Sequence, residues 1–119
     1  GTALTMPEAS DVDEVVDLLS DAYAWRILVH TREEAKSVDA LSDACDADES
    51  TIYRRVQRLQ EADLLTDDQM LDPDGHHYKV YAANLDAVHV YLEAEGFEVD
   101  VERREAPADR FTRLYEGFK

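Results

Sequence analysis

The sequence predicts an α+β fold, because its apolar residues follow two different spacings in two parts of the chain. Up to about residue 62 they recur three and four positions apart, which is the spacing of one face of an α-helix. After residue 64 they alternate with polar residues, as in half-buried strands. The segment that opens at Pro107 returns to the helical spacing. The predicted order is four helices, two hairpins and a terminal helix.

The first two helices are predicted on either side of a break at Ser20 and Asp21. Ser10 is a candidate N-cap for the first, whose apolar positions are Val12, Val15, Val16 and Leu19. The second spans about residues 22–31 and buries Ala24, Ile27 and Leu28, with Trp25 on another apolar face.

The next two helices form a short helix, a turn and a longer helix. Ser37 is the predicted cap of the short one, in which Val38, Leu41 and Cys45 share one side. Asp48 is the predicted N-cap of the longer one, about residues 49–62, which buries Ile52, Val56 and Leu59. This order is that of a helix-turn-helix.

Two hairpins are predicted after residue 64. "DDQML" and "HYKVYAA" flank "DPDGHH", in which Pro and Gly indicate a turn. The second hairpin alternates Val88, Val90 and Leu92 with polar residues, turns at "AEG", and alternates again at Phe97, Val99 and Val101. Asn84 offers the alternative of a helix cap, but the strict alternation and β-branched residues favour strands.

Length and composition indicate one domain of 119 residues. We expect residues 10–83 to form a DNA-binding region, and 84–119, the second hairpin and terminal helix, to complete the same domain. No apolar run approaches the roughly 18 residues that cross a bilayer, and no signal peptide is evident. A cytoplasmic protein without membrane contact is therefore expected.

The charge balance is unusual, with 28 acidic residues, 12 basic residues and a net charge of −16. The carboxylates are spread along the whole chain, and the only lysines are Lys36, Lys79 and Lys119. Such a coat resembles adaptation to very high cytoplasmic salt, which screens self-repulsion. An ordinary acidic protein is the alternative.

Against this background, "DESTIYRRVQRLQ" gathers Arg54, Arg55 and Arg58 on the predicted exposed side of the longer helix. Guanidinium groups donate paired hydrogen bonds to phosphate and to the O6/N7 edge of guanine. The pattern therefore favours nucleic-acid recognition. The alternative is a surface helix whose arginines pair with Glu49, Glu61 or Asp63.

The stretch from "LLSDAYAWRILVH" through "SVDALSDACDADESTIYRRVQRLQEADLL" resembles the winged helix-turn-helix of arsenic-repressor-type bacterial and archaeal transcription regulators. The resemblance covers residues 18–83. The acidic coat narrows the resemblance to the haloarchaeal members of this family. Among these members, the sequence most resembles regulators of the response to reactive oxygen species. Members of this family usually have a glycine directly after the longer helix, where this chain has Asp63. The backbone there must therefore do without the residue that adopts left-handed conformations most easily.

The resemblance implies binding to double-stranded DNA, and the apolar stripe of the terminal helix favours a homodimer on a pseudo-palindromic operator. Bases or phosphates would be contacted from the helix-turn-helix and from a wing at the first hairpin, by Lys36, Ser37, Ser50, Thr51, Tyr53, Arg54, Arg55, Arg58, His76, His77 and Lys79. Dimerisation is expected from the terminal helix and the first one, through Val12, Val15, Leu19, Phe111, Leu114, Tyr115 and Phe118. Packing of the terminal helix on its own second hairpin is the alternative.

Other kinds of site have weaker support. His76 and His77 beside Asp72 and Asp74 suggest a metal site, but adjacent histidines point oppositely on a strand and "DPDG" lacks the further ligands of a calcium loop, so none is predicted. Cys45, on a buried helix side with acids nearby, is expected to pack rather than sense redox state. No catalytic motif is present, so an enzyme with a small-molecule substrate is not expected. No cofactor is predicted beyond cations such as potassium at the DNA interface. The competing function is a winged-helix module that binds a protein and not DNA.

Overall fold

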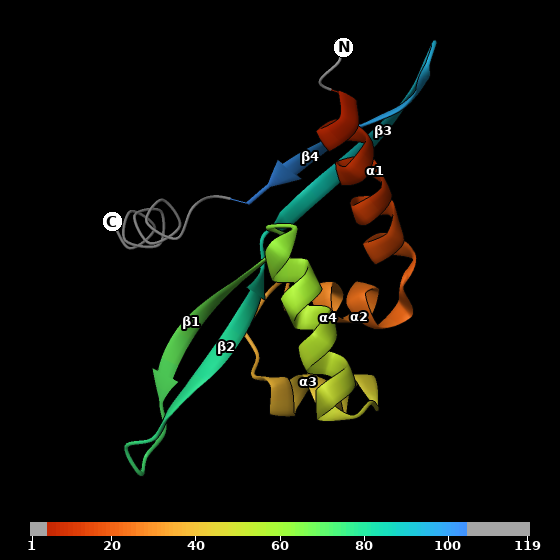
Figure 1. Cartoon of the computed structure of the whole chain (residues 1–119). Helices are drawn as coiled ribbons and strands as arrows, with labels where there is room; N and C mark the ends of the chain where they lie inside the picture. The colour runs from red at the N-terminus through yellow and green to blue at the C-terminus, as the bar shows by residue number, and fades with distance from the viewer. Residues whose placement is uncertain (1–4, 105–119) are drawn as a thin grey trace, which may run out of the picture.

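The helical and hairpin halves expected from the sequence are both present (Figure 1). The structure is a computed structural model that describes residues 5–104, with side chains described from residue 13 onward. Its elements are α1 (Thr5–Ser20), α2 (Ala22–His30), α3 (Val38–Cys45), α4 (Glu49–Glu61), β1 (Leu65–Leu71), β2 (His77–Ala83), β3 (Leu85–Glu93) and β4 (Gly96–Arg103). The α+β prediction is confirmed, and the helix predicted from Pro107 lies outside the described residues.

The four helices share one apolar core, which the first hairpin closes from the side. The predicted stripe of α4, Ile52, Val56 and Leu59, is fully buried. It packs with residues of every other helix and of the first hairpin, among them Leu18, Ile27, Leu41, Leu65 and Tyr81. Burial of these side chains fixes which face of α4 is left to solvent.

The helix caps follow the prediction in two of three cases. Ser37 caps α3, where its Oγ accepts a hydrogen bond from the Ala40 N–H at 3.1 Å. Asp48 occupies the N-cap position of α4, although its side chain makes no capping hydrogen bond. Ser10 as the N-cap of α1 is wrong, because that helix already begins at Thr5. Pro7 permits the earlier start, since proline in a first turn removes no helical hydrogen bond.

The first hairpin pairs β1 and β2 in register from Leu65↔Ala83 to Leu71↔His77. Its turn is closed by the Asp72 N–H, which donates to the His76 carbonyl at 2.9 Å, and Gly75 supplies a φ of 86° there. An isolated bridge between Lys36 and Tyr81 ties the segment before α3 to β2.

The second hairpin confirms strands, rather than a helix, after Asn84. Val88↔Val101, Val90↔Val99 and Leu92↔Phe97 are cross-strand partners, so one face of β3 and β4 is apolar. α1 packs against β4, and the two hairpins form separate two-stranded sheets. Figure 1 shows them extending in opposite directions from the helices, and the molecule measures 56 × 41 × 20 Å. None of the described helices has the length and apolar character needed to span a bilayer.

The prediction for the first helix in dimerisation needs correction at Val15. This side chain is 4% exposed and belongs to the core, and Leu19 is half-buried against the same core. A side chain buried within one chain presents almost no surface to another. The exposed apolar side chain of α1 in its described part is Val16, at 46%. The remaining predicted dimerisation side chains, Val12, Phe111, Leu114, Tyr115 and Phe118, lie outside the described ones.

The exit from α4 does require left-handed backbone, and Asp63 adopts it with a φ of 60°. Asp tolerates this region better than most L-residues because its short side chain bonds locally. Two side chains from the second half of the chain also contact this backbone. Asn84 Nδ2 donates to the Asp63 carbonyl at 3.1 Å, and Arg103 Nε donates to the same oxygen at 2.9 Å. These two side chains thus hold the backbone of Asp63 in its left-handed conformation.

Candidate nucleic-acid interface

α4 presents its outer side to solvent along the first half of its length. Ser50, Tyr53, Arg54 and Gln57 are all exposed, whereas Thr51 is half-buried. Arg54 makes no ion pair with any residue that the structure describes. Its guanidinium group is therefore available to a ligand that approaches this side. The sequence correctly placed Ser50 and Arg54 on the outer side.

Arg55, predicted to reach DNA, instead faces the junction of α1 and α2. Its Nε donates to Asp21 Oδ2 at 3.0 Å, and its guanidinium carbon lies 5.7 Å from the centre of the Tyr23 ring. The other carboxylate oxygen of Asp21 accepts the N–H groups of Tyr23 and Ala24, both at 3.0 Å. Burial raises the pKa of Asp21, but these N–H groups and Arg55 outweigh it and lower that pKa below its ordinary value.

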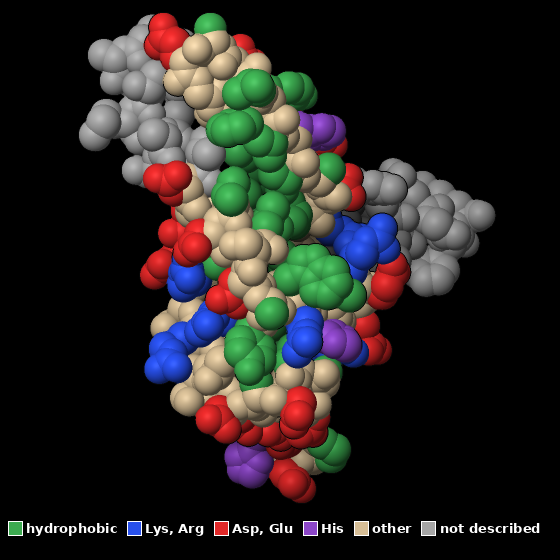
Figure 2. All heavy atoms as spheres, turned by 90° about the vertical axis from the view of Figure 1, so that its right-hand side faces the viewer, with side chains coloured by type: hydrophobic (Ala, Val, Ile, Leu, Met, Phe, Trp, Pro, Cys, Tyr) green, Lys and Arg blue, Asp and Glu red, His purple; other side chains and the backbone are tan. Residues whose placement is uncertain are grey.

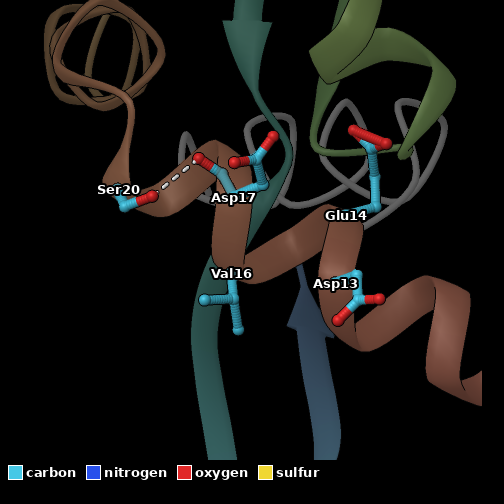
Figure 3. Close-up of a pocket in the computed structure, with 5 residues that line it drawn as sticks. All are labelled: Asp13, Glu14, Val16, Asp17 and Ser20. Atoms are coloured by element: carbon cyan, nitrogen blue, oxygen red, sulfur yellow. Dashed lines mark hydrogen bonds between the residues drawn. The ribbon is translucent and has the colours of Figure 1, made fainter.

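Arg58, one turn further along, is bound to α1. Its Nη2 donates to Glu14 Oε1 at 3.0 Å and to Asp17 Oδ2 at 2.9 Å, and the two carboxylates raise the pKa of Arg58. Figure 3 shows Glu14 and Asp17 pointing to one side of α1, with Val16 pointing to the other. The predicted band of three arginines is thus divided. Arg54 faces outward, and Arg55 and Arg58 fasten α4 to the first two helices.

The predicted contacts before α3 are also used within the chain. The Lys36 side chain pairs with Glu34 at 2.9 Å, and the backbone of Lys36 exchanges hydrogen bonds with Tyr81. Ser37 Oγ serves as the cap of α3. Each of these residues thus has an internal partner that a phosphate would need to displace or share.

The wing predicted at the first hairpin projects into solvent with acids among its cations. His76 and His77 are exposed, and Lys79 Nζ lies 3.5 Å from Asp67 Oδ2. Asp72 Oδ1 accepts the backbone N–H groups of Asp74 and His76 and so shapes the tip. Asp72, Asp74 and His76 each offer one side-chain atom that could bind a metal ion, and these three atoms lie within 4.8 Å of one another. The sequence indicates these residues as a candidate metal site, which we reject because adjacent histidines point oppositely on a strand and "DPDG" lacks the further ligands of a calcium loop.

The start of α4 is negatively charged. A hydrogen bond with Asp39, and then its charge, raise the pKa of Glu49, with a smaller contribution from Asp43. These carboxylates lie where a phosphate would otherwise meet the positive end of the helix. These carboxylates would repel an anionic partner that approached this end of the helix.

Asp21 and Arg103 are the residues with structural roles at this site that sequence reasoning missed. Asp21 was assigned to a break between helices, although an Asp before a helix start is a usual capping signal. Arg103 carried no local signal, because its partners Ala62 and Asp63 are about 40 positions away along the chain.

The comparisons with known proteins bear on the fold. Searches of protein-family models and of curated proteins found no match. Among solved structures, the chain is similar to NolR from Sinorhizobium fredii, a winged-helix transcription regulator, with a TM-score of 0.58 and 16% sequence identity. The likeness covers 72% of this chain and 81% of NolR. The chain therefore has a winged-helix fold, with α3 and α4 as the helix-turn-helix and β1–β2 as the wing.

Proposed function

We propose that this chain is a sequence-specific DNA-binding transcription regulator in which α4 enters the major groove. The observation that carries the proposal is the exposed side of α4, where Arg54 stands beside Ser50, Tyr53 and Gln57 on the second helix of a helix-turn-helix. That helix is the one that meets base edges in proteins of this architecture. An exposed Arg is suited to the O6/N7 edge of guanine.

The finer features of the proposal come from the sequence. The acidic coat suits a haloarchaeal cytoplasm rich in potassium, and the resemblance to arsenic-repressor-type regulators suggests a homodimer on a pseudo-palindromic operator. A response to reactive oxygen species is the stimulus that the same resemblance favours. Potassium ions between the phosphates and acids such as Glu49 and Asp39 would complete the interface.

The test replaces Arg54 and a matched arginine on another surface. Arg54→Ala should weaken binding to the cognate duplex by about 1–3 kcal/mol, or about 5- to 150-fold in Kd. Arg26→Ala removes an exposed guanidinium from α2 and should leave Kd unchanged. Binding sites selected from random duplexes in molar KCl supply the cognate DNA, and fluorescence anisotropy supplies Kd. Equal affinities of wild type and Arg54→Ala, with both proteins folded, would contradict the proposal.

A protein-binding winged helix is the second candidate, and one observation favours it. Arg55 and Arg58 are bound within the chain, and acids surround the cations of the wing. A surface with few available cations is unusual for a DNA-binding protein. This candidate gains if no duplex is enriched in the selection.

A further inference from the structure

One side of α4 carries neutral and basic side chains and no carboxylate. This side, the outer stripe, consists of Ser50, Tyr53, Arg54 and Gln57. The spacing of three, four and seven positions puts these exposed residues on one face of the helix, opposite its buried side chains. The whole chain has 28 acidic residues but three glutamines and one asparagine. The exposed amide of Gln57, on a face without acids, is therefore an unusual choice for this sequence.

The polar side chains of Gln57 and Arg54 are both available to a ligand. Among the residues that the structure describes, neither the Gln57 amide nor the Arg54 guanidinium group has a hydrogen-bond partner. The neighbouring Arg55 and Arg58 differ, because both pair with carboxylates of the first two helices. A ligand can therefore meet Gln57 and Arg54 without breaking a contact that holds α4 in place.

The amide of Gln57 matches one base edge of the major groove. Its carbonyl oxygen can accept a hydrogen bond from adenine N6, and its NH2 group can donate to adenine N7. A guanidinium group such as that of Arg54 donates instead to O6 and N7 of guanine. A carboxylate at position 57 could not donate to N7, so the adenine edge requires the amide.

The spacing of the two residues matches the spacing of base pairs. Arg54 and Gln57 are three positions apart, which corresponds to about 4.5 Å along the axis of an α-helix. Successive base pairs of a duplex are about 3.4 Å apart. When α4 lies along the groove, the two side chains therefore reach neighbouring base pairs.

We infer that Gln57 is a specificity-determining residue that binds the edge of an adenine, in the base pair next to the guanine bound by Arg54. The inference rests on the proposed function, in which α4 enters the major groove, and it adds a second base to the recognised sequence. The bound DNA then contains an A·T pair directly beside a G·C pair, and this A·T pair is recognised through Gln57.

Charge alone gives a duplex little to recognise on this protein. Figure 2 shows basic side chains gathered at mid-height of the side that it displays, the height at which α4 lies in Figure 1, and a group of acidic side chains below them. Molar KCl also screens the attraction between cations and phosphates. A hydrogen bond between a neutral amide and a base does not depend on net charge, so it can discriminate between sequences under these conditions.

The test compares the base preferences of variants at position 57. The duplex selected by wild type in molar KCl is changed one base pair at a time, and fluorescence anisotropy gives Kd for each duplex. Gln57→Ala should bind the selected duplex about 5- to 150-fold more weakly and lose its preference at the A·T pair. Gln57→Glu should instead prefer cytosine in place of that adenine, because a carboxylate accepts from cytosine N4. A helix that was merely distorted would not gain a new preference.

Two further variants serve as controls and separate this inference from the proposed function. Arg54→Ala should lose the preference at the neighbouring G·C pair and keep the preference at the A·T pair. Gln69→Ala removes the same exposed amide from β1 and should keep both preferences. If Gln57→Ala has the base preferences of wild type while Arg54→Ala loses its own, the inference is overturned and the proposed function stands. If wild type shows no preference among duplexes, both are overturned.

Discussion

Arg55 Nε lies 3.0 Å from Asp21 Oδ2, although 34 positions separate the two residues in the sequence. One carboxylate therefore caps α2 with one oxygen and holds α4 with the other. The position of the helix that presents Arg54 depends on this contact. Arg55 and Arg58, which are bound to α1 and α2, therefore determine the direction in which the exposed side of α4 faces.

Replacing Asp21 should separate its two roles. Asp21→Ala loses the cap and the ion pair and should lower the free energy of unfolding by about 1–2 kcal/mol. Asp21→Asn keeps a capping oxygen and should cost about half as much. Urea unfolding measures both. An Asn variant as stable as wild type would show that the charge on Asp21 contributes nothing through Arg55, whereas equal losses for the two variants would show that the capping oxygen contributes nothing.

The pKa of Asp21 gives this contact a pH dependence. Because the folded pKa is below the ordinary value of 3.8, the stabilisation is complete above that value and is lost as the pH falls through the folded pKa. The difference in unfolding free energy between wild type and Asp21→Asn should therefore shrink as the pH is lowered below about 4. A difference that stays constant on acidification would contradict the role of the carboxylate.

Asp63 offers a test of the left-handed exit from α4. Asp63→Gly relieves the backbone at φ 60° and loses an exposed ion pair with Arg103, which is worth about 0–1 kcal/mol. Asp63→Ala loses the same pair and keeps the backbone cost of about 1 kcal/mol. The Gly variant should thus be the more stable of the two by about 1 kcal/mol in thermal or urea unfolding. Equal stabilities would mean that the backbone there is not strained.

Cys45 should be unreactive in the folded protein. Its side chain is 2% exposed, and burial raises the pKa of the thiol despite the opposing charge of Arg26. Modification by a disulfide reagent should be slow in native conditions and fast after unfolding in urea. Rapid modification of the native protein would instead make Cys45 a candidate redox sensor.

The salt dependence of DNA binding tests the role of cations. Most DNA-binding proteins lose affinity steeply with salt because they release cations from the duplex. Here the carboxylates of Glu49 and Asp39 should retain cations, so Kd should change little, or improve, from moderate to molar KCl. Glu49→Gln should restore part of the ordinary loss. A steep loss of affinity for wild type across the whole range would exclude cation uptake.

The parts of the fold that depend on local pattern could be predicted from the sequence. Ile52, Val56 and Leu59 are buried because three- and four-residue spacing puts them on one face, and Leu92 opposes Phe97 because strands alternate. The partners of Arg55 and Arg58 could not be predicted in this way. Their carboxylates lie 34 to 44 positions away, and in so acidic a chain no local signal distinguishes Asp21 or Glu14 from the other acids.

The most direct measurement of the central claim is a map of amide chemical shifts during titration with the selected duplex in molar KCl. The largest changes should fall on the first half of α4, at Ser50, Tyr53 and Arg54, with smaller ones at the wing near His77 and Lys79. Amides of the β3–β4 hairpin should not change. Absence of changes in α4, or changes confined to the hairpin, would contradict the claim that the outer side of α4 meets DNA.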